Sequence, residues 1–309
     1  MSVSSAASPK VIVSVPATSA NVGPGFDCLG VALNLANRFT FQVGTTPLSI
    51  RYRGTDHVSQ SRDNLVYRAF CRAFEVAGHP IPPLDLELEL NIPLSRGLGS
   101  SATAIVGGLL GANTLGELRL SPETLLNLAI ALEGHPDNVV PAMKGGCQLS
   151  VQGSQGTWTF CELDWHESIA VIVAVPDFKV STETAREVLP QTVSMADAIF
   201  TASHLGLLIR SLQLGHSDWL RVALHDRLHQ PARMDLIPGF RAVQTAALHG
   251  GAFGVVISGA GPSVLALGSH EARVSIAAAM VNAWTQMDIG AEAHLLTLDR
   301  QGARTTIVS

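Results

Sequence analysis

Three long stretches of this sequence contain no Asp, Glu, Lys or Arg, and they constrain the fold more than any other feature. They span residues 11–26, 97–116 and 242–270. A membrane-spanning helix needs about 20 predominantly apolar residues, but glycine, serine, threonine or proline interrupts each stretch before that length is reached. The stretches therefore indicate buried strands, buried helices and glycine-rich loops of a globular chain.

Composition excludes several other classes of protein. Hydrophobic residues make up 47% of the 309 residues and charged residues 15%, which excludes intrinsic disorder. The net charge is −5 and forms no basic stripe, so we expect no nucleic-acid partner. The four cysteines lie far apart, which favours neither a zinc site nor a disulfide framework. The N-terminal segment MSVSSAASPK lacks an apolar stretch behind a basic start, so we expect no secretory signal.

The periodicity of apolar residues predicts a mixed fold. Alternating apolar and acidic residues predict a strand over residues 84–92, and helical spacing predicts helices over 64–77 and 102–115. Such a mixture of strands and helices indicates an α+β or α/β fold in two layers. The polar, turn-rich stretch over residues 150–168 is the expected boundary between two domains.

The strongest local signal is the segment PLSRGLGSSAT at residues 93–103, where a strand leads into a glycine-rich turn and a helix. Glycines let the backbone approach a ligand closely, and the free N–H groups at a helix N-terminus attract phosphate. Ser100 and Ser101 add hydroxyls for phosphate or Mg²⁺. The same residues would also make a simple tight turn with a serine cap.

Two familiar nucleotide motifs fit this segment poorly. The Walker pattern is absent because the segment contains no lysine. Gly97, Gly99 and Ala102 match the G-x-G-x-x-A pattern of dinucleotide-binding proteins in form. No second strand follows before the next helix pattern, however, which disfavours an oxidoreductase.

Two further segments place single charges among turn-forming residues. Asp27 is the only charge in residues 16–30, and it either caps a turn or holds a substrate ammonium. Residues 133–138, EGHPDN, are expected to form a loop that leads into a strand, and Glu133 would complete a Mg²⁺ site with a serine hydroxyl. The other polar residues of this loop would otherwise serve only in the turn or the core: His135, Asp137 and Asn138.

The order and content of the motifs together resemble the GHMP kinase superfamily, and within it the homoserine kinases. The segments that carry the resemblance are SANVGPGFD at residues 19–27, PLSRGLGSSATA at 93–104, HPDN at 135–138, STETAR at 181–186 and SGAGPSV at 258–264. Each segment alone is moderately specific, and the set is much more so. The resemblance extends from about residue 11 into the C-terminal region.

This resemblance implies an α+β fold of two domains. Residues 1–165 would form an N-terminal nucleotide-binding domain like ribosomal protein S5, and residues 166–309 a C-terminal ferredoxin-like α/β sandwich that completes the substrate site. The superfamily phosphorylates a hydroxyl group with ATP and Mg²⁺, and homoserine kinases make O-phospho-L-homoserine from L-homoserine on the route to threonine. A cytoplasmic homodimer with no membrane partner is implied as well.

The resemblance also implies roles for the nucleotide-binding residues. Asn64 occupies the position that contacts adenine. Ser101 and Glu133 would hold the metal, although the spacing from Glu133 to the Asp-Asn pair is shorter than in mevalonate kinase. The phosphate loop would comprise Pro93, Leu94, Ser95, Arg96, Gly97, Leu98, Gly99, Ser100, Ser101, Ala102 and Thr103.

For the substrate, the resemblance implies a site that complements an amino acid. Arg186 and Arg233 would bind its carboxylate through their planar guanidinium groups. Without the motif, each would be interpreted as a solvated surface arginine. Asp27 would bind the ammonium. The remaining pocket residues would be Asn21, His135, Asn138 and Thr182, and the catalytic residues Asp137, Asn138 and Arg186.

The resemblance implies direct in-line phosphoryl transfer, which relies on positioning and charge stabilisation, with Asp137 as a candidate base. Three alternatives stay open. A sister kinase would act on a mevalonate-type or diphosphocytidyl substrate, which has no ammonium for Asp27 to bind. A binding protein that retained the nucleotide fold would bind ATP without turnover. An oxidoreductase would bind NAD.

Overall fold

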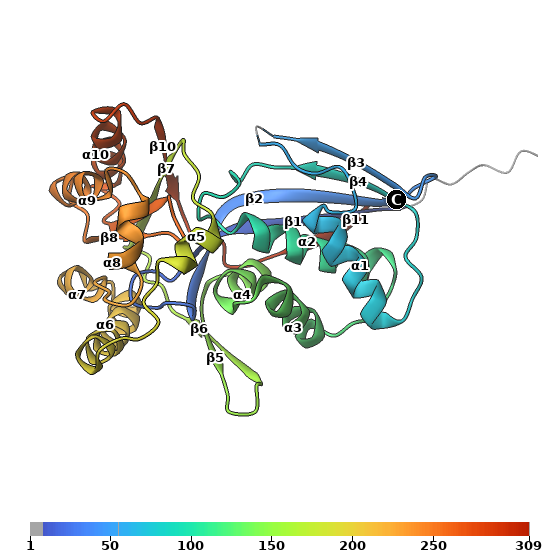
Figure 1. The fold of residues 1–309 in the computed structure, drawn as a ribbon, viewed down its shortest axis with the longest axis horizontal. Coiled ribbons are helices and arrows are strands. Elements are labelled where there is room, and N and C mark those ends of the chain that lie inside the picture. The colour runs from blue at the N-terminus through green and yellow to red at the C-terminus, as the bar shows by residue number, and fades with distance from the viewer. Residues whose placement is uncertain (1–8, 55, 309) are drawn as a thin grey trace, which may run out of the picture.

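A computed structural model describes residues 9–54 and 56–308, and most of the segment searched for a secretory signal lies outside these ranges. Two sheets of different size stand side by side, each with its own helices (Figure 1). None of the helices in the described residues combines the length and apolar character that crossing a bilayer requires.

The larger sheet has seven strands, and four helices cover one of its faces (Figure 1). Its main order is β11-β1-β2-β4-β3, and β5 pairs with both β2 and β6. Only β3 and β4 are parallel. The strands are β1 (Lys10–Ala20), β2 (Leu29–Val43), β3 (Leu48–Arg53), β4 (Leu84–Glu89), β5 (Cys147–Gln152), β6 (Trp158–Leu163) and β11 (Arg304–Val308). The helices are α1 (Leu65–Ala77), α2 (Ser100–Leu115), α3 (Pro122–Glu133) and α4 (Pro136–Lys144).

The glycines of α2 let this helix lie very close to the sheet. A Cβ atom at Gly107 would collide with the ring of Phe39, and one at Gly111 with the ring of Phe41. Both phenylalanines belong to β2 and are fully buried. Glycine weakens an isolated helix by about 1 kcal/mol relative to alanine, so the packing against the sheet stabilises α2. The close packing fixes α2 on the sheet, and its N-terminus directly follows the loop that comes after β4.

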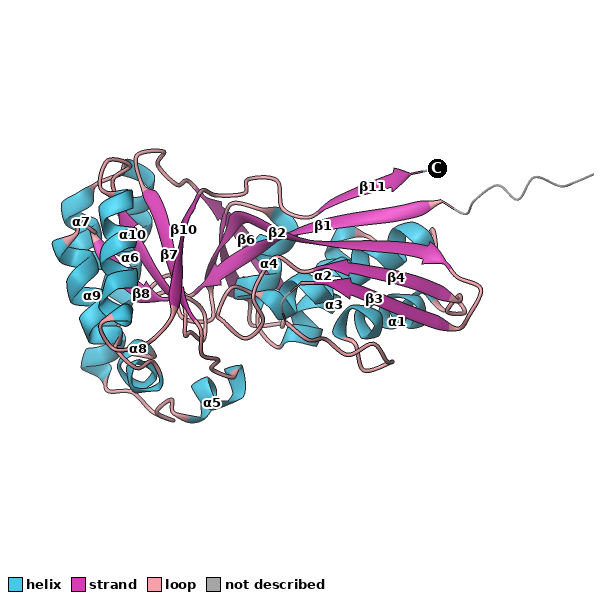
Figure 2. Cartoon of the chain, turned by 90° about the horizontal axis from the view of Figure 1, so that it is seen from above, coloured by secondary structure: helices cyan, strands magenta, loops and turns pink. Residues whose placement is uncertain are grey.

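The smaller sheet is antiparallel, with the strand order β10-β7-β9-β8. Helices lie on both faces of this sheet, and the short α5 lies between the two sheets (Figure 1). Figure 2 shows the same elements from above. Its strands are β7 (Ala170–Pro176), β8 (Gly254–Ile257), β9 (Val264–Gly268) and β10 (Ala291–Leu296). Its helices are α5 (Thr182–Glu187), α6 (Met195–Leu214), α7 (Ser217–Ala223), α8 (Gln230–Arg233), the 3₁₀ turn η1 (Met234–Leu236), α9 (Phe240–His249) and α10 (Arg273–Thr285).

A shared apolar core joins the two parts of the molecule. Ala17 and Leu29 from β1 and β2 pack in one cluster with Val173 of β7 and with Leu208 and Leu212 of α6. All five side chains are fully buried. Burial of apolar surface contributes about 25 cal/mol per Å², so this cluster holds the two sheets in a fixed relation.

The expected domain boundary between residues 165 and 166 lies in the connection from β6 to β7. We keep it as a proposal, with one addition from the topology. After β10 the chain returns to the larger sheet, where β11 pairs with β1 in antiparallel register. The larger sheet therefore also contains residues from the far C-terminal end of the chain.

One local prediction was wrong. Residues 133–138 were expected to be a loop followed by a strand, but Pro136 begins helix α4 and occupies its first turn. Proline is favoured there because its fixed φ suits a helix and no hydrogen bond is lost. Asp137 and Asn138 are therefore held on a helix and are both buried.

Candidate functional site

The phosphate loop connects β4 to α2, and tertiary contacts hold its backbone. Gly99 precedes α2 with a left-handed conformation (φ 67°), and no side chain caps the helix. The first N–H groups of α2 thus stay available, and together with the helix dipole they attract a phosphate. Ser258 Oγ donates to the carbonyl oxygen of Gly97 (2.6 Å), and Ser263 N–H donates to that of Arg96 (3.1 Å).

The GAGPS turn at residues 259–263 therefore connects two strands and also supports the backbone of the phosphate loop. It lies directly behind the phosphate loop. A Cβ at Gly97, where φ is +77°, would collide with the carbonyl oxygens of Ser258 and Gly261. Glycine at residue 97 is the residue that permits this contact between the two parts of the molecule.

A cavity of about 70 Å³ lies in front of the phosphate loop, between the two sheets. Residues from widely separated segments of the chain line it. Among them are most of the residues that the motifs singled out: Asn21, Asp27, Ser95, Gly97, Gly99, Ser100, Ser101, Glu133, His135, Asp137, Asn138, Thr182, Arg186 and Arg233. We call this cavity the substrate pocket.

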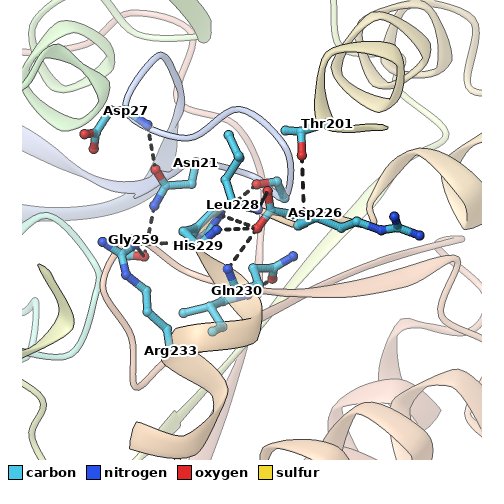
Figure 3. A network of polar contacts seen from close by, with 12 residues as sticks. Asn21, Asp27, Thr201, Asp226, Leu228, His229, Gln230, Arg233 and Gly259 are labelled. Carbon is cyan, nitrogen blue, oxygen red and sulfur yellow. Dashed lines mark hydrogen bonds and ion pairs between the residues drawn. The ribbon is translucent and has the colours of Figure 1, made fainter. Parts of the chain in front are cut away.

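Asp27 and Arg186 pair with each other across the substrate pocket. The two guanidinium nitrogens of Arg186 lie 2.9 and 3.1 Å from the two carboxylate oxygens of Asp27. Asn21 fixes Asp27 from behind, because its Oδ1 accepts from Asp27 N–H and its Nδ2 donates to the carbonyl oxygen of Gly259, each over 3.0 Å (Figure 3). Both amide atoms of Asn21 are therefore already engaged.

Arg233 is only 2% exposed, and the scaffold holds its guanidinium on one side. Its Nε donates to the carbonyl oxygen of Ala185 (3.0 Å) and its Nη1 to that of Gly259 (3.2 Å). Nη2 makes no hydrogen bond to any described residue and belongs to a side chain that lines the substrate pocket. Burial lowers the pKa of Arg233, as desolvation of a cation requires, and the arginine still stays charged.

His229 lies behind Arg233, and the sequence motifs gave no role to it. Its side chain is fully buried and stacks on the ring of Phe26, with the centroids 5.0 Å apart. Its Nε2 lies 2.9 Å from the carbonyl oxygen of Gly23, and its Nδ1 lies 3.3 Å from Nη1 of Arg233 (Figure 3). The arginine can only donate, so the histidine is neutral with its proton on Nε2. The one sequence signal was its place four residues before Arg233, a proposed ligand.

The protonation of His229 makes a testable contribution to stability. Burial lowers its pKa from 6.5, although the Asp226 carboxylate opposes this shift. As the pH falls below about 6.5, the unfolded chain gains a proton that the folded chain does not, so the free energy of unfolding decreases. We expect the decrease between about pH 7.5 and 5.5 to be roughly 1 kcal/mol smaller in His229→Gln, as measured by urea unfolding. An identical pH dependence in both proteins would contradict this assignment.

Ser101 and Glu133 meet at the other side of the substrate pocket. Ser101 Oγ donates to Glu133 Oε1 over 2.6 Å. Burial raises the pKa of Glu133, and the hydrogen bond from Ser101 opposes that rise. No three His, Cys, Asp or Glu side chains gather into a metal cluster within residues 9–54 and 56–308. A hydroxyl and one carboxylate beside a phosphate loop nevertheless fit Mg²⁺, which takes few protein ligands and completes its shell with phosphates and water.

Asp137 and Asn138 lie in the first turn of α4 and line the substrate pocket. Asn138 Oδ1 accepts from Thr18 Oγ1 over 2.7 Å. His135 Nδ1 donates to the Asp137 carboxylate, which is 2% exposed. Burial disfavours the charged imidazole, but the bond to Asp137 outweighs this effect and raises the pKa of His135.

Several residues of the predicted phosphate loop lie outside the substrate pocket. Leu98 is in the shared core, Ala102 in the core of the larger sheet, and Thr103 bonds to Asn37 and to the Ser100 carbonyl oxygen. Arg96 turns away toward the end of β7. Such residues can reach a phosphate only through their backbone, so their side chains shape the loop instead.

Asn64 lines a second cavity, of about 260 Å³, which adjoins Ser95, Ser100 and Ser101. The cavity is otherwise largely apolar, with Phe39 and Leu88 among the side chains that line it. Asn64 caps α1, because its Oδ1 accepts from Val66 N–H (3.0 Å), and its Nδ2 donates to the carbonyl oxygen of Ser59 (2.7 Å).

The cap predicts a specific cost. We expect Asn64→Ala to lower the free energy of unfolding by about 1 kcal/mol, because α1 loses its capping acceptor. Asn64→Asp keeps the acceptor and should lose clearly less. Urea unfolding of the two variants measures the difference, and equal losses would exclude capping as the main role of the side chain.

Comparisons with known proteins agree with this arrangement. The family model of the GHMP kinases N terminal domain matches residues 64–146, and that of the GHMP kinases C terminal domain matches residues 202–286. Homoserine kinase from Synechococcus sp. is 53% identical over 96% of this chain and 97% of its own length. The enzyme of the same name from Thermosynechococcus vestitus is 52% identical over 94% and 97%.

Solved structures show the same fold. Homoserine kinase from Cytophaga hutchinsonii superimposes with a TM-score of 0.87 at 30% identity, covering 99% of this chain and 100% of the other. Mevalonate kinase from L. major, at 17% identity, has a TM-score of 0.68 over 91% and 95%, which bears on the fold alone. The two-domain fold expected from the resemblance is thus confirmed.

Fold and site together define an ATP-dependent small-molecule kinase of the GHMP class. The chain belongs to the homoserine kinases within that class.

Proposed function

We propose that this chain transfers the γ-phosphoryl group of ATP to the side-chain hydroxyl of L-homoserine, giving O-phospho-L-homoserine for threonine biosynthesis. One observation carries the proposal. Beside a phosphate loop, the substrate pocket brings the carboxylate of Asp27 together with two guanidinium groups, those of Arg186 and Arg233. This set complements an ammonium and a carboxylate on one small molecule, and the names of the relatives agree with it.

Substrate binding proceeds by exchange of ion pairs. In the structure Arg186 neutralises Asp27. A zwitterion replaces this pair: its ammonium takes the place of Arg186 at Asp27, and its carboxylate accepts from Arg186 and from Nη2 of Arg233. One opposite-charge contact is thereby broken and three are formed, which offsets the desolvation of the substrate. A substrate without an ammonium gains no such compensation.

ATP occupies the neighbouring positions. Its adenine enters the largely apolar cavity beside Asn64, and its phosphates reach the free N–H groups of α2. Ser101 and Glu133 would hold Mg²⁺, which supplies positive charge to the phosphates. Phosphoryl transfer of this kind depends on alignment and charge stabilisation. The positive charge of Arg186 also favours the charged form of Glu133, because it acts to lower the pKa of that carboxyl group.

The hydroxyl of the substrate lies toward α4. Asp137 and Asn138 orient it for direct in-line attack. Asp137 already accepts a hydrogen bond from His135, so this carboxylate is held in place and one of its lone pairs is occupied. We therefore assign Asp137 an orienting role. It accepts the proton of the substrate hydroxyl only after the bond between the hydroxyl oxygen and the γ-phosphorus has begun to form.

An ADP-release assay with several acceptors tests the proposal. We expect rapid turnover with L-homoserine and little with mevalonate, galactose or a diphosphocytidyl alcohol. Turnover with mevalonate but not L-homoserine would favour a sister kinase. ATP binding without turnover of any acceptor would favour a binding protein, and either result would overturn the proposal.

The resemblance also implies a cytoplasmic homodimer, and both points stay predictions. Light scattering on the purified protein measures the mass of the assembly directly, and a monomeric mass would contradict the predicted dimer.

A further inference from the structure

Two charged side chains link the phosphate loop to the segment that carries part of the substrate pocket. This segment, residues 177–181, connects β7 to α5 and is here called the β7–α5 segment. Arg96 of the phosphate loop donates two hydrogen bonds where β7 ends and this segment begins. Its Nε donates to the carbonyl oxygen of Pro176 (2.9 Å), and its Nη2 donates to that of Asp177 (2.6 Å). Thr182 and Arg186 follow directly in α5.

Asp56 makes the second link and joins three segments. Its Oδ2 accepts from Leu94 N–H at the start of the phosphate loop (2.7 Å), and its Oδ1 accepts from Lys179 Nζ in the β7–α5 segment (2.8 Å). Burial alone would raise the pKa of Asp56, but the hydrogen bonds from Lys179 and Leu94 lower it. Asp56 itself precedes the residues that line the adenine cavity, Val58 and Ser59.

These links cross a part of the molecule that apolar packing does not fill. A cavity of about 560 Å³ lies there, lined by Asp56, Arg96, Pro176, Asp177 and residues of β10. Lys179 and Asp56 lie at the surface, with side-chain exposures of 53% and 19%. Because this cavity separates the two segments, the polar links hold the β7–α5 segment in position against the phosphate loop.

We propose that Asp56 and Lys179 are positioning residues that couple nucleotide binding to substrate binding. Neither touches a reacting group. A nucleotide that orders the phosphate loop and the adenine cavity also orders Asp56, and through Lys179 it fixes the segment that leads to Thr182 and Arg186. Such coupling is reciprocal, so each ligand raises the affinity for the other by the same factor. The inference rests on the proposed function.

Binding of L-homoserine with and without a non-hydrolysable ATP analogue and Mg²⁺ tests the coupling. The coupling factor is the Kd for L-homoserine without the analogue divided by the Kd with it. We expect it to exceed one in the wild type and to fall about two- to fivefold in Lys179→Met, a size set by the exposure of the ion pair. Asp56→Asn should lose a similar amount, and the double variant no more than either single one. Lys179→Arg should retain most of the coupling.

A matched control removes the cation of another ion pair, Arg72, whose side chain is 50% exposed against 53% for Lys179. Arg72 and Glu75 pair over 3.2 Å on α1, away from both cavities, so Arg72→Met should leave the coupling factor unchanged. A wild-type factor of one, or an unchanged factor in Lys179→Met while the wild type turns over L-homoserine, would overturn the coupling alone. Failure of the wild type to bind L-homoserine at all would overturn both this inference and the proposed function.

Discussion

Replacing Arg233 by methionine is expected to raise the KM for L-homoserine about 10- to 100-fold, because a charge-assisted hydrogen bond to the carboxylate is lost. The KM for ATP should change by no more than about twofold, since Arg233 does not line the adenine cavity. Methionine fills a similar volume and cannot donate. Steady-state kinetics with each substrate varied in turn measures the split.

The same variant should also be less stable. The carbonyl oxygens of Ala185 and Gly259 lose their buried donor, which we expect to lower the free energy of unfolding by about 2–4 kcal/mol. Arg241→Met, at an exposed position on α9, serves as the control and should change neither KM nor stability. Equal increases in both KM values for Arg233→Met would contradict its assignment to the carboxylate.

Replacing Glu133 by glutamine is expected to lower kcat about 100- to 1000-fold with little change in the affinity for L-homoserine. The amide keeps an acceptor for Ser101 but removes the negative charge, so the Mg²⁺ concentration for half-maximal rate should rise at least about tenfold. Loss of charge stabilisation that acts mainly in the transition state lowers kcat rather than raising KM.

A titration of the rate against Mg²⁺, with calorimetry for L-homoserine binding, checks this expectation. Glu123→Gln is a matched control, because Glu123 is an exposed carboxylate in the first turn of the same helix, α3. A Glu133→Gln variant with normal Mg²⁺ dependence would remove Glu133 from the proposed metal site.

Local sequence predicted those parts of the site that a single segment builds. The phosphate loop is one such part, because a strand, a glycine-rich turn and a helix follow one another within residues 84–115. Backbone geometry of this kind depends on nearest neighbours. Helix α4 was missed although Pro136 signalled its first turn, since turn-forming residues on both sides outweighed that signal.

Contacts between segments far apart in the chain could not be predicted from local sequence patterns. The sequence marked Arg96 as part of the phosphate loop, but its guanidinium binds the end of β7, 80 residues away. The His229 network likewise joins α8 to Gly23, 206 residues earlier. Neither contact leaves a periodic trace in the sequence.

The sequence by itself thus determined the class of fold, the phosphate loop and the charged residues that a small zwitterion needs. Only the tertiary structure decided which of those charges face one another. Asp27 and Arg186 are 159 residues apart and form one ion pair, and Arg233 reaches the same pocket because Gly259 and Ala185 hold it there. The physical reason is that spacing along the chain sets local backbone geometry, whereas the direction of a buried charge depends on the partners that packing brings to it.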